Sequence, residues 1–417
     1  MQIKGIRSSC IHRWVPRAGA ALALVLGPAG PARAAWPTLE DVWRASRQRA
    51  PESVRAQTET TIARSEGVGA RMSSLDNPSL LFAADHGVGP TPAGASAGLQ
   101  VSAGLGLPIE IGGQRSTRIR SIEALVSWRE REQAAAEGRA GGAAIVAYGH
   151  AVVARARVEQ ASQAEAQART EVTWFEARVQ AGDATAVDRS LAQTELARYA
   201  QFRAEAQIDL ALASADLQAL TGLMDLGDPP PDVEPVLPRI GVRHAPEAPA
   251  VEAFEREQLY WDRQVEQARA ARWAPLVVTI TSGQDEFGQV RMGGGLGWSL
   301  PLVRGNEGEI ERAATAASRA RADRDAVAQA VDAKIRGLRE QLARTGEALL
   351  ELDRAGIPAA EGLVQATDGA FRAGKLELVR VLNARRDLAL MRGRRLDLLE
   401  SGWRAYGDLA GVLGALP

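Results

Sequence analysis

Residues 97–107, AGLQVSAGLGL, decide the fold class, because an apolar side chain occupies every odd position from Ala97 to Leu107. The even positions between them carry only Gly, Gln and Ser. Residues 289–300, QVRMGGGLGWSL, repeat this alternation. A period of two is typical of a β-strand with two unlike faces. We therefore predict one strand in each stretch, paired with strands at residues 79–86 and 276–283.

Each alternating strand is about 11 residues long, which is the length that a tilted strand needs to cross a bilayer. The apolar face would then contact lipid, and an ordinary half-buried hairpin is the alternative. Closed barrels have at least about eight strands, so four strands per chain require a barrel shared between copies of the chain. The residues predicted to face lipid are Leu99, Val101, Val290, Met292 and Leu296.

The chain contains an internal duplication, because landmarks of one half return in the same order and at nearly constant spacing in the other. Ala50-Pro51-Glu52 returns as Ala245-Pro246-Glu247, and Ala181-Gly182-Asp183 returns as Ala373-Gly374-Lys375. The halves are joined by a segment that contains seven of the chain's 20 prolines and can be neither a helix nor a central strand. We predict a first structural repeat at 35–227, a Pro-rich connector at 228–249 and a second repeat at 250–417.

Long helices fill the rest of each repeat. A capping box at Thr38 to Asp41 starts a first helix, predicted to run to Met72. Residues 115–180 and 307–372 are rich in Ala, Glu, Arg and Gln, and each would form a helix roughly 100 Å long. Pro358 predicts a kink in the second of these helices. Helices at 185–220 and 376–413 return along them. The predicted fold class is thus mainly α with a small β part, in long antiparallel helical hairpins that form an α-helical barrel.

The N-terminus has the pattern of an export signal at residues 1–34. A basic segment precedes the apolar run Ala18 to Gly27, and Ala32-Arg33-Ala34 supplies a small-x-small cleavage site. The alternative is an uncleaved membrane anchor. The single cysteine, Cys10, lies within this segment, so no intrachain disulfide is expected. The net charge of −1 argues against nucleic acid as a partner.

Catalytic and metal-binding motifs are not evident. His86, His150 and His244 lie far apart and in no metal-ligand spacing, and no Gly-x-Ser-x-Gly elbow occurs. Residues 293–297 are Gly-rich, but no Lys-Ser or Lys-Thr follows them as in a phosphate-binding loop. We therefore predict no enzyme, no cofactor and no bound metal.

Taken together and in order, several short motifs resemble the TolC-like family of outer-membrane efflux factors across almost the whole chain after residue 34. The resemblance implies a homotrimer with a twelve-stranded barrel in the outer membrane of a Gram-negative bacterium and a long helical periplasmic tunnel. It also implies a periplasmic adaptor and an inner-membrane pump as partners. Residues 108–115 are similar to the branch that serves heavy-metal exporters. The motifs are Thr38-Leu39-Glu40-Asp41, Asn77-Pro78-Ser79-Leu80, Pro108-Ile109-Glu110-Ile111-Gly112-Gly113-Gln114-Arg115, Leu300-Pro301-Leu302-Val303 and the two Ala-Gly turns.

The two Ala-Gly turns are predicted to form the membrane-distal tips that contact the adaptor. The residues concerned are Gly182, Asp183, Gly374 and Lys375.

The gate of the family often carries two acidic residues shortly after the second tip glycine, and here those positions are Arg380 and Asn383. The repeat equivalent of Arg380 is Asp188. In a trimer the two charges would alternate around the entrance, so we predict that ion pairs between Asp188 and Arg380 hold the closed state. The alternative is that both are solvated charges on a helix face.

Two classes of function remain on the sequence. The first is a passive outer-membrane duct that exports small molecules or metal cations delivered by a pump. The second is a periplasmic coiled-coil adaptor or scaffold without a barrel. The strands with one apolar face favour the duct.

Overall fold

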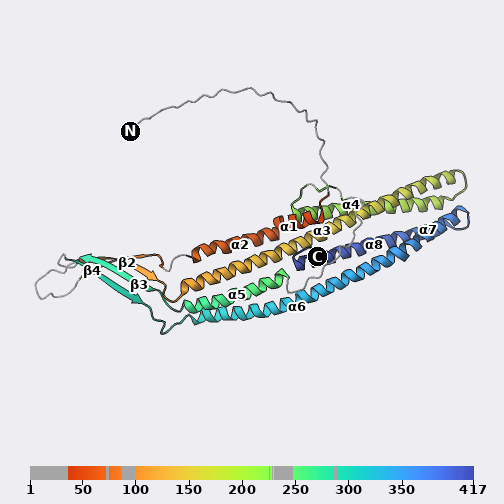
Figure 1. The fold of residues 1–417 in the computed structure, drawn as a ribbon. Helices are drawn as coiled ribbons and strands as arrows, with labels where there is room; N and C mark the ends of the chain where they lie inside the picture. Colours follow the sequence, from red (N-terminus) through yellow and green to blue (C-terminus); the bar gives the residue numbers. More distant parts are fainter. Residues whose placement is uncertain are drawn as a thin grey trace, which may run out of the picture.

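The computed structural model describes residues 36–71, 75–86, 99–224, 226, 227, 229, 248–284 and 289–417. The molecule is elongated, with a small sheet at one end and helical hairpins that reach the other (Figure 1). The predicted signal segment and most of the Pro-rich connector lie outside the described residues.

The first repeat differs from the prediction in its first helix. Two helices, α1 (Leu39–Arg49) and α2 (Pro51–Ala70), replace the single helix expected from Thr38 to Met72. The break follows from Pro51, because the proline ring disfavours helical geometry at the preceding residue and Ala50 accordingly has ψ 140°. The predicted cap at Thr38 is confirmed, since its Oγ1 accepts a hydrogen bond from the Asp41 backbone N–H at 3.2 Å. The remaining elements are β1 (Ser79–His86), β2 (Leu99–Ile109), α3 (Gln114–Gln180) and α4 (Ala186–Thr221).

The second repeat has the same order, and its long helix is interrupted where the first repeat has a continuous one. The expected disturbance near Pro358 takes the form of a π-helical turn, Leu352–Gly356, directly before the proline. Proline has no backbone N–H and therefore cannot donate the usual helical hydrogen bond. A π turn is a local change of hydrogen-bond pattern that accommodates such a residue within a helix. The elements are α5 (Pro249–Ala270), β3 (Leu276–Gln284), β4 (Val290–Trp298), α6 (Glu307–Glu351), the π turn, α7 (Ile357–Arg372) and α8 (Leu378–Leu413).

The four predicted strands form one antiparallel sheet in the order β1-β2-β3-β4. β1 and β4 are its edges, and each pairs with a neighbour on one side only. Among the described residues, no helix combines the length and the apolar character that a bilayer-spanning helix requires.

The middle of α3 packs closely against the end of α8. A side chain at Gly142 would place its Cβ 2.5 Å from the carbonyl oxygen of Gly407 and 2.7 Å from the Cα of Gly411. A Cβ at Gly149 would lie 2.4 Å from the Trp403 side chain. The interior glycines of α3, unfavourable for an isolated helix, therefore permit two helix backbones to touch. Around this crossing lies the main core, which includes Val42 of α1 and Leu217 of α4.

Candidate functional site

The sheet has one mainly apolar face, on which His86, Ser282 and Gln284 are the polar residues. Residues paired directly across antiparallel strands point to the same side. Leu105 pairs with Leu80 on one side and with Ile280 on the other, and Val278 pairs with both Leu107 and Leu296. By the same register, all five residues predicted to contact lipid lie on this face. They are Leu99, Val101, Val290, Met292 and Leu296.

This apolar face is uncovered within the chain. Met292 is 80% exposed and Leu296 is 76% exposed. The opposite face carries mainly small and polar residues, such as Ser102, Thr279 and Thr281. Soluble proteins rarely leave so many large apolar side chains exposed on one face, so the face requires an apolar partner.

The two predicted tips lie together at the end of the molecule opposite the sheet (Figure 1). Gly182 and Gly374 both adopt the left-handed conformation, with φ 81° and 68°. In both turns the next residue closes the helix end, because Asp183 N–H donates to Arg178 O and Lys375 N–H donates to Ala370 O. Two equivalent Schellman turns therefore present Asp183 and Lys375 to solvent.

Behind the tips, the two hairpins are tied together by contacts that the sequence did not reveal. Trp174 packs against Phe175 and Phe371, with ring centroids 4.8 and 6.0 Å from its own. Arg385 of α8 forms ion pairs with Glu171 of α3 and with Asp368 of α7. Burial lowers the pKa of the Arg385 guanidinium.

Arg386 also crosses between the hairpins. It forms an ion pair with Glu195 of α4, whose carboxylate is buried, and this hydrogen bond raises the pKa of Arg386. Aromatic contacts and ion pairs therefore join the hairpin α3–α4 to the hairpin α7–α8 close to the predicted entrance.

Asp188 and Arg380 lie on the first turns of α4 and α8, on equivalent positions of the repeats, and Asn383 lies on the second turn of α8. The Asp188 carboxylate accepts hydrogen bonds from the Thr185 backbone N–H at 3.0 Å and from its hydroxyl at 2.7 Å, which completes a capping box. Arg380 and Asn383 are exposed on α8. Within the described part of a single chain, Asp188 and Arg380 form no ion pair, so pairing between copies stays a prediction.

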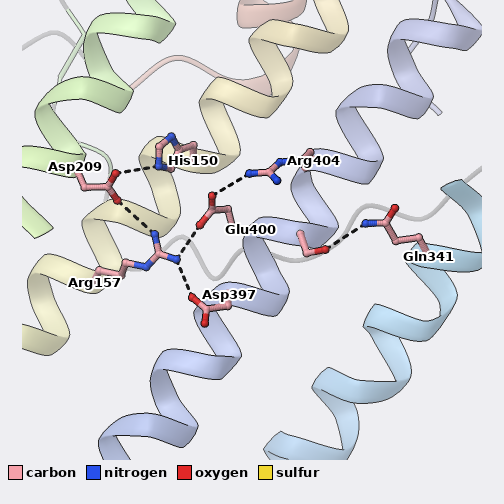
Figure 2. Close-up of polar contacts among 8 residues, drawn as sticks. His150, Arg157, Asp209, Gln341, Asp397, Glu400 and Arg404 are labelled. Atoms are coloured by element: carbon pink, nitrogen blue, oxygen red, sulfur yellow. Dashed lines mark hydrogen bonds and ion pairs between the residues drawn. The ribbon is translucent and has the colours of Figure 1, made fainter.

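A second polar cluster joins three helices at mid-length (Figure 2). Arg157 of α3 contacts Asp209 of α4 at 3.3 Å, and Asp397 and Glu400 of α8 at 2.9 and 2.8 Å. Burial opposes the charge of Arg157, but the contacts with Glu400 and Asp397 outweigh it and raise its pKa.

His150 of α3 takes part in the same cluster, with its Nε2 3.2 Å from Asp209. These partners lie far apart in the sequence, and helical periodicity alone carries no signal for such a contact. Throughout the described residues there is no group of three or more metal-ligating side chains placed to hold a metal ion.

Comparison with known proteins shows which proteins this chain resembles. No family model matches the chain. The cobalt-zinc-cadmium resistance protein CzcC of Cupriavidus metallidurans is 27% identical over 327 residues, which cover 75% of this chain and 77% of CzcC. A crystal structure of CusC, from work on the conformational changes that accompany folding and transmembrane channel formation, aligns with a TM-score of 0.77 at 15% identity. The alignment covers 90% of this chain and 92% of CusC. The outer membrane protein VceC of Vibrio cholerae aligns with a TM-score of 0.72 at 17% identity over 90% and 96% of the two chains.

These similarities confirm the predicted fold class, which is mainly helical with long hairpins and a small sheet of four strands. They also confirm the resemblance to the TolC-like outer-membrane efflux factors.

Proposed function

We propose that this protein is the outer-membrane duct of a tripartite efflux system in a Gram-negative bacterium. The observation that carries the proposal is the sheet with one exposed, mainly apolar face, joined end-on to hairpins of long helices. Such a sheet suits the hydrocarbon layer of a membrane, and the helices form a long extension into the periplasm. An export signal at residues 1–34 would direct the chain there.

The open edges of the sheet support assembly of the barrel from several chains. A bilayer offers no water to an unpaired strand edge, so β1 and β4 need partners. The antiparallel order of the four strands gives β1 and β4 opposite directions, so β4 of one copy can pair with β1 of the next in an antiparallel manner. A homotrimer closes a barrel of twelve strands, which exceeds the minimum of about eight.

At the other end of the molecule, the tips Gly182-Asp183 and Gly374-Lys375 are the contact surface for a periplasmic adaptor, which links the duct to an inner-membrane pump. Asp188, Arg380 and Asn383 border the entrance next to these tips. The duct acts passively, because the pump supplies the energy and selects the cargo.

The cargo comprises small molecules or metal cations. The similarity to CzcC, a cobalt-zinc-cadmium resistance protein, supports metal cations as one class. Deletion of the gene should then sensitise the cell to Co²⁺, Zn²⁺ or Cd²⁺, whereas sensitivity to organic compounds alone would point to the other class of cargo.

Membrane fractionation tests the duct against the alternative of a periplasmic adaptor or scaffold. A duct stays in the outer-membrane fraction after a high-salt wash and is released only by detergent. Release of the protein by salt alone would contradict the proposal. Val101→Asp, placed on the apolar face, should reduce membrane retention, and Ser102→Asp on the opposite face serves as the matched control.

A further inference from the structure

The segment between β4 and α6 carries two apolar side chains whose exposed fractions exceed those of the large apolar side chains in the sheet. Leu302 is 84% exposed and Val303 is 93% exposed. Leu300 is exposed as well. These residues belong to the Leu-Pro-Leu-Val motif of the second repeat. The motif is part of neither the sheet nor the tips, so the proposed function gives it no role.

Hydrogen bonds hold the segment in place. Across Pro301, the Leu302 N–H donates to Leu300 O at 2.8 Å. Farther along, Gly305 N–H donates to the Glu307 carboxylate at 2.9 Å, and the Asn306 side chain donates to Ala268 O of α5 at 2.9 Å. The exposure of Leu302 and Val303 is therefore built into an ordered turn and does not result from a loose loop.

The surroundings of the turn are those of a membrane interface. Trp298, the last residue of β4, stacks on Trp273 with ring centroids 5.8 Å apart and planes inclined by 21°. The Trp298 indole N–H donates to Ala274 O at 3.2 Å. Trp298 also shares the apolar face of the sheet, because it pairs with Leu276. Tryptophan is enriched where a membrane protein passes from hydrocarbon to headgroups.

A positive charge completes this surface. Arg304 follows Val303 directly and is exposed, and within the described ranges it forms no ion pair. An exposed guanidinium beside two apolar side chains matches a phospholipid, which presents a phosphate directly above its acyl chains.

The first repeat provides an internal comparison. Leu107-Pro108 occupies the position of Leu300-Pro301, but β2 continues through Ile109, which pairs with Leu276. Pro108 O also accepts a hydrogen bond from the Asp76 N–H at 3.1 Å. The same motif is thus part of the sheet in one repeat and projects from the molecule in the other.

We infer that residues 300–304 form an interfacial membrane anchor, in which Leu302 and Val303 enter the boundary between headgroups and acyl chains of the periplasmic leaflet. This inference rests on the proposed outer-membrane location. In a trimer, three such anchors surround the base of the barrel and fix its depth in the membrane.

Spin-label accessibility in vesicles tests the anchor. Cys10, the only cysteine, lies in the predicted signal segment, so the exported chain carries one label at a time, and Cys10→Ser removes the remaining thiol where the segment is retained. The labelled variants are Leu302→Cys, Met292→Cys on the sheet face and Lys375→Cys at a tip. The full chain is reconstituted in phosphatidylethanolamine and phosphatidylglycerol vesicles, and collisions with O₂, which concentrates in lipid, are compared with collisions with a water-soluble nickel chelate.

The expected result is that the labels at 302 and 292 relax faster with O₂ and the label at 375 relaxes faster with nickel. If the label at 292 prefers O₂ but the label at 302 prefers nickel, the anchor is overturned and the proposed duct stands. If the label at 302 is shielded from both reagents, a second copy of the chain covers it, which also overturns the anchor. A label at 292 that prefers nickel overturns the membrane barrel and the anchor together.

Discussion

Replacement of Gly142 by Ala should destabilise the protein, whereas the same replacement in an open part of a helix should stabilise it. The new Cβ at position 142 would meet two backbone atoms of α8 at 2.5 and 2.7 Å, although ordinary contact begins at 3.4 Å. Backbone atoms cannot rotate away, so α3 and α8 must separate, and overpacking of this kind costs about 1 to 3 kcal/mol. Ala is better than Gly in a helix by about 0.5 to 1 kcal/mol, so the net fall in the free energy of unfolding should be at most about 2.5 kcal/mol.

Gly337 of α6 is the matched control, because nothing lies within 4 Å of its Cβ position. Gly337→Ala should raise the free energy of unfolding by about 0.5 to 1 kcal/mol. Denaturant unfolding of the detergent-solubilised protein, followed by circular dichroism at 222 nm, measures both variants. If Gly142→Ala is as stable as the original protein while Gly337→Ala shows the expected gain, α3 and α8 do not pack as closely as described.

Three further predictions concern the two ends of the molecule. On the sheet, Val101→Arg should cost up to about 2 to 4 kcal/mol of barrel stability near the membrane midplane and Gln100→Arg much less, and equal losses on unfolding from vesicles would exclude the assigned faces. At the tips, Asp183→Cys should crosslink to a cysteine-labelled adaptor, and crosslinking only from the loops of the sheet would reverse the orientation. At the gate, Arg380→Asp should raise the conductance of the isolated channel and the added Asp188→Arg should lower it again. Each exposed ion pair contributes only about 0 to 1 kcal/mol, so several pairs must act together to keep the gate closed. An unchanged conductance would mean that Asp188 and Arg380 are solvated charges that do not hold the gate.

Local patterns were sufficient for most of the elements. Alternation over residues 97–107 predicted β2 within two residues at each end, because the period of a half-buried strand is written in adjacent positions. The break at Pro51 could also have been predicted, since proline excludes helical geometry at the residue before it. The kink at Pro358 stays a prediction, and the π turn directly before it is a feature that the sequence does not determine.

Contacts between distant elements could not be predicted. Arg157 and Glu400 lie on different helices and in different repeats, and each alone has the character of a solvated helix charge. The interior glycines of α3 are unfavourable in an isolated helix, and only the contacts of Gly138 and Gly142 with the end of α8 explain their presence. A single sequence shows the spacing of apolar residues along each helix, but it does not show which other helix packs against them.

Native mass spectrometry of the protein, extracted from the outer membrane in detergent, counts the chains in the assembled particle. The apolar face and the open edges β1 and β4 require several chains for a closed barrel, so we expect particles of three chains that still form a conducting pore in a planar bilayer. A monomer that carries the same conductance, or a protein recovered only from the salt-soluble periplasmic fraction, would exclude a membrane barrel shared between three chains.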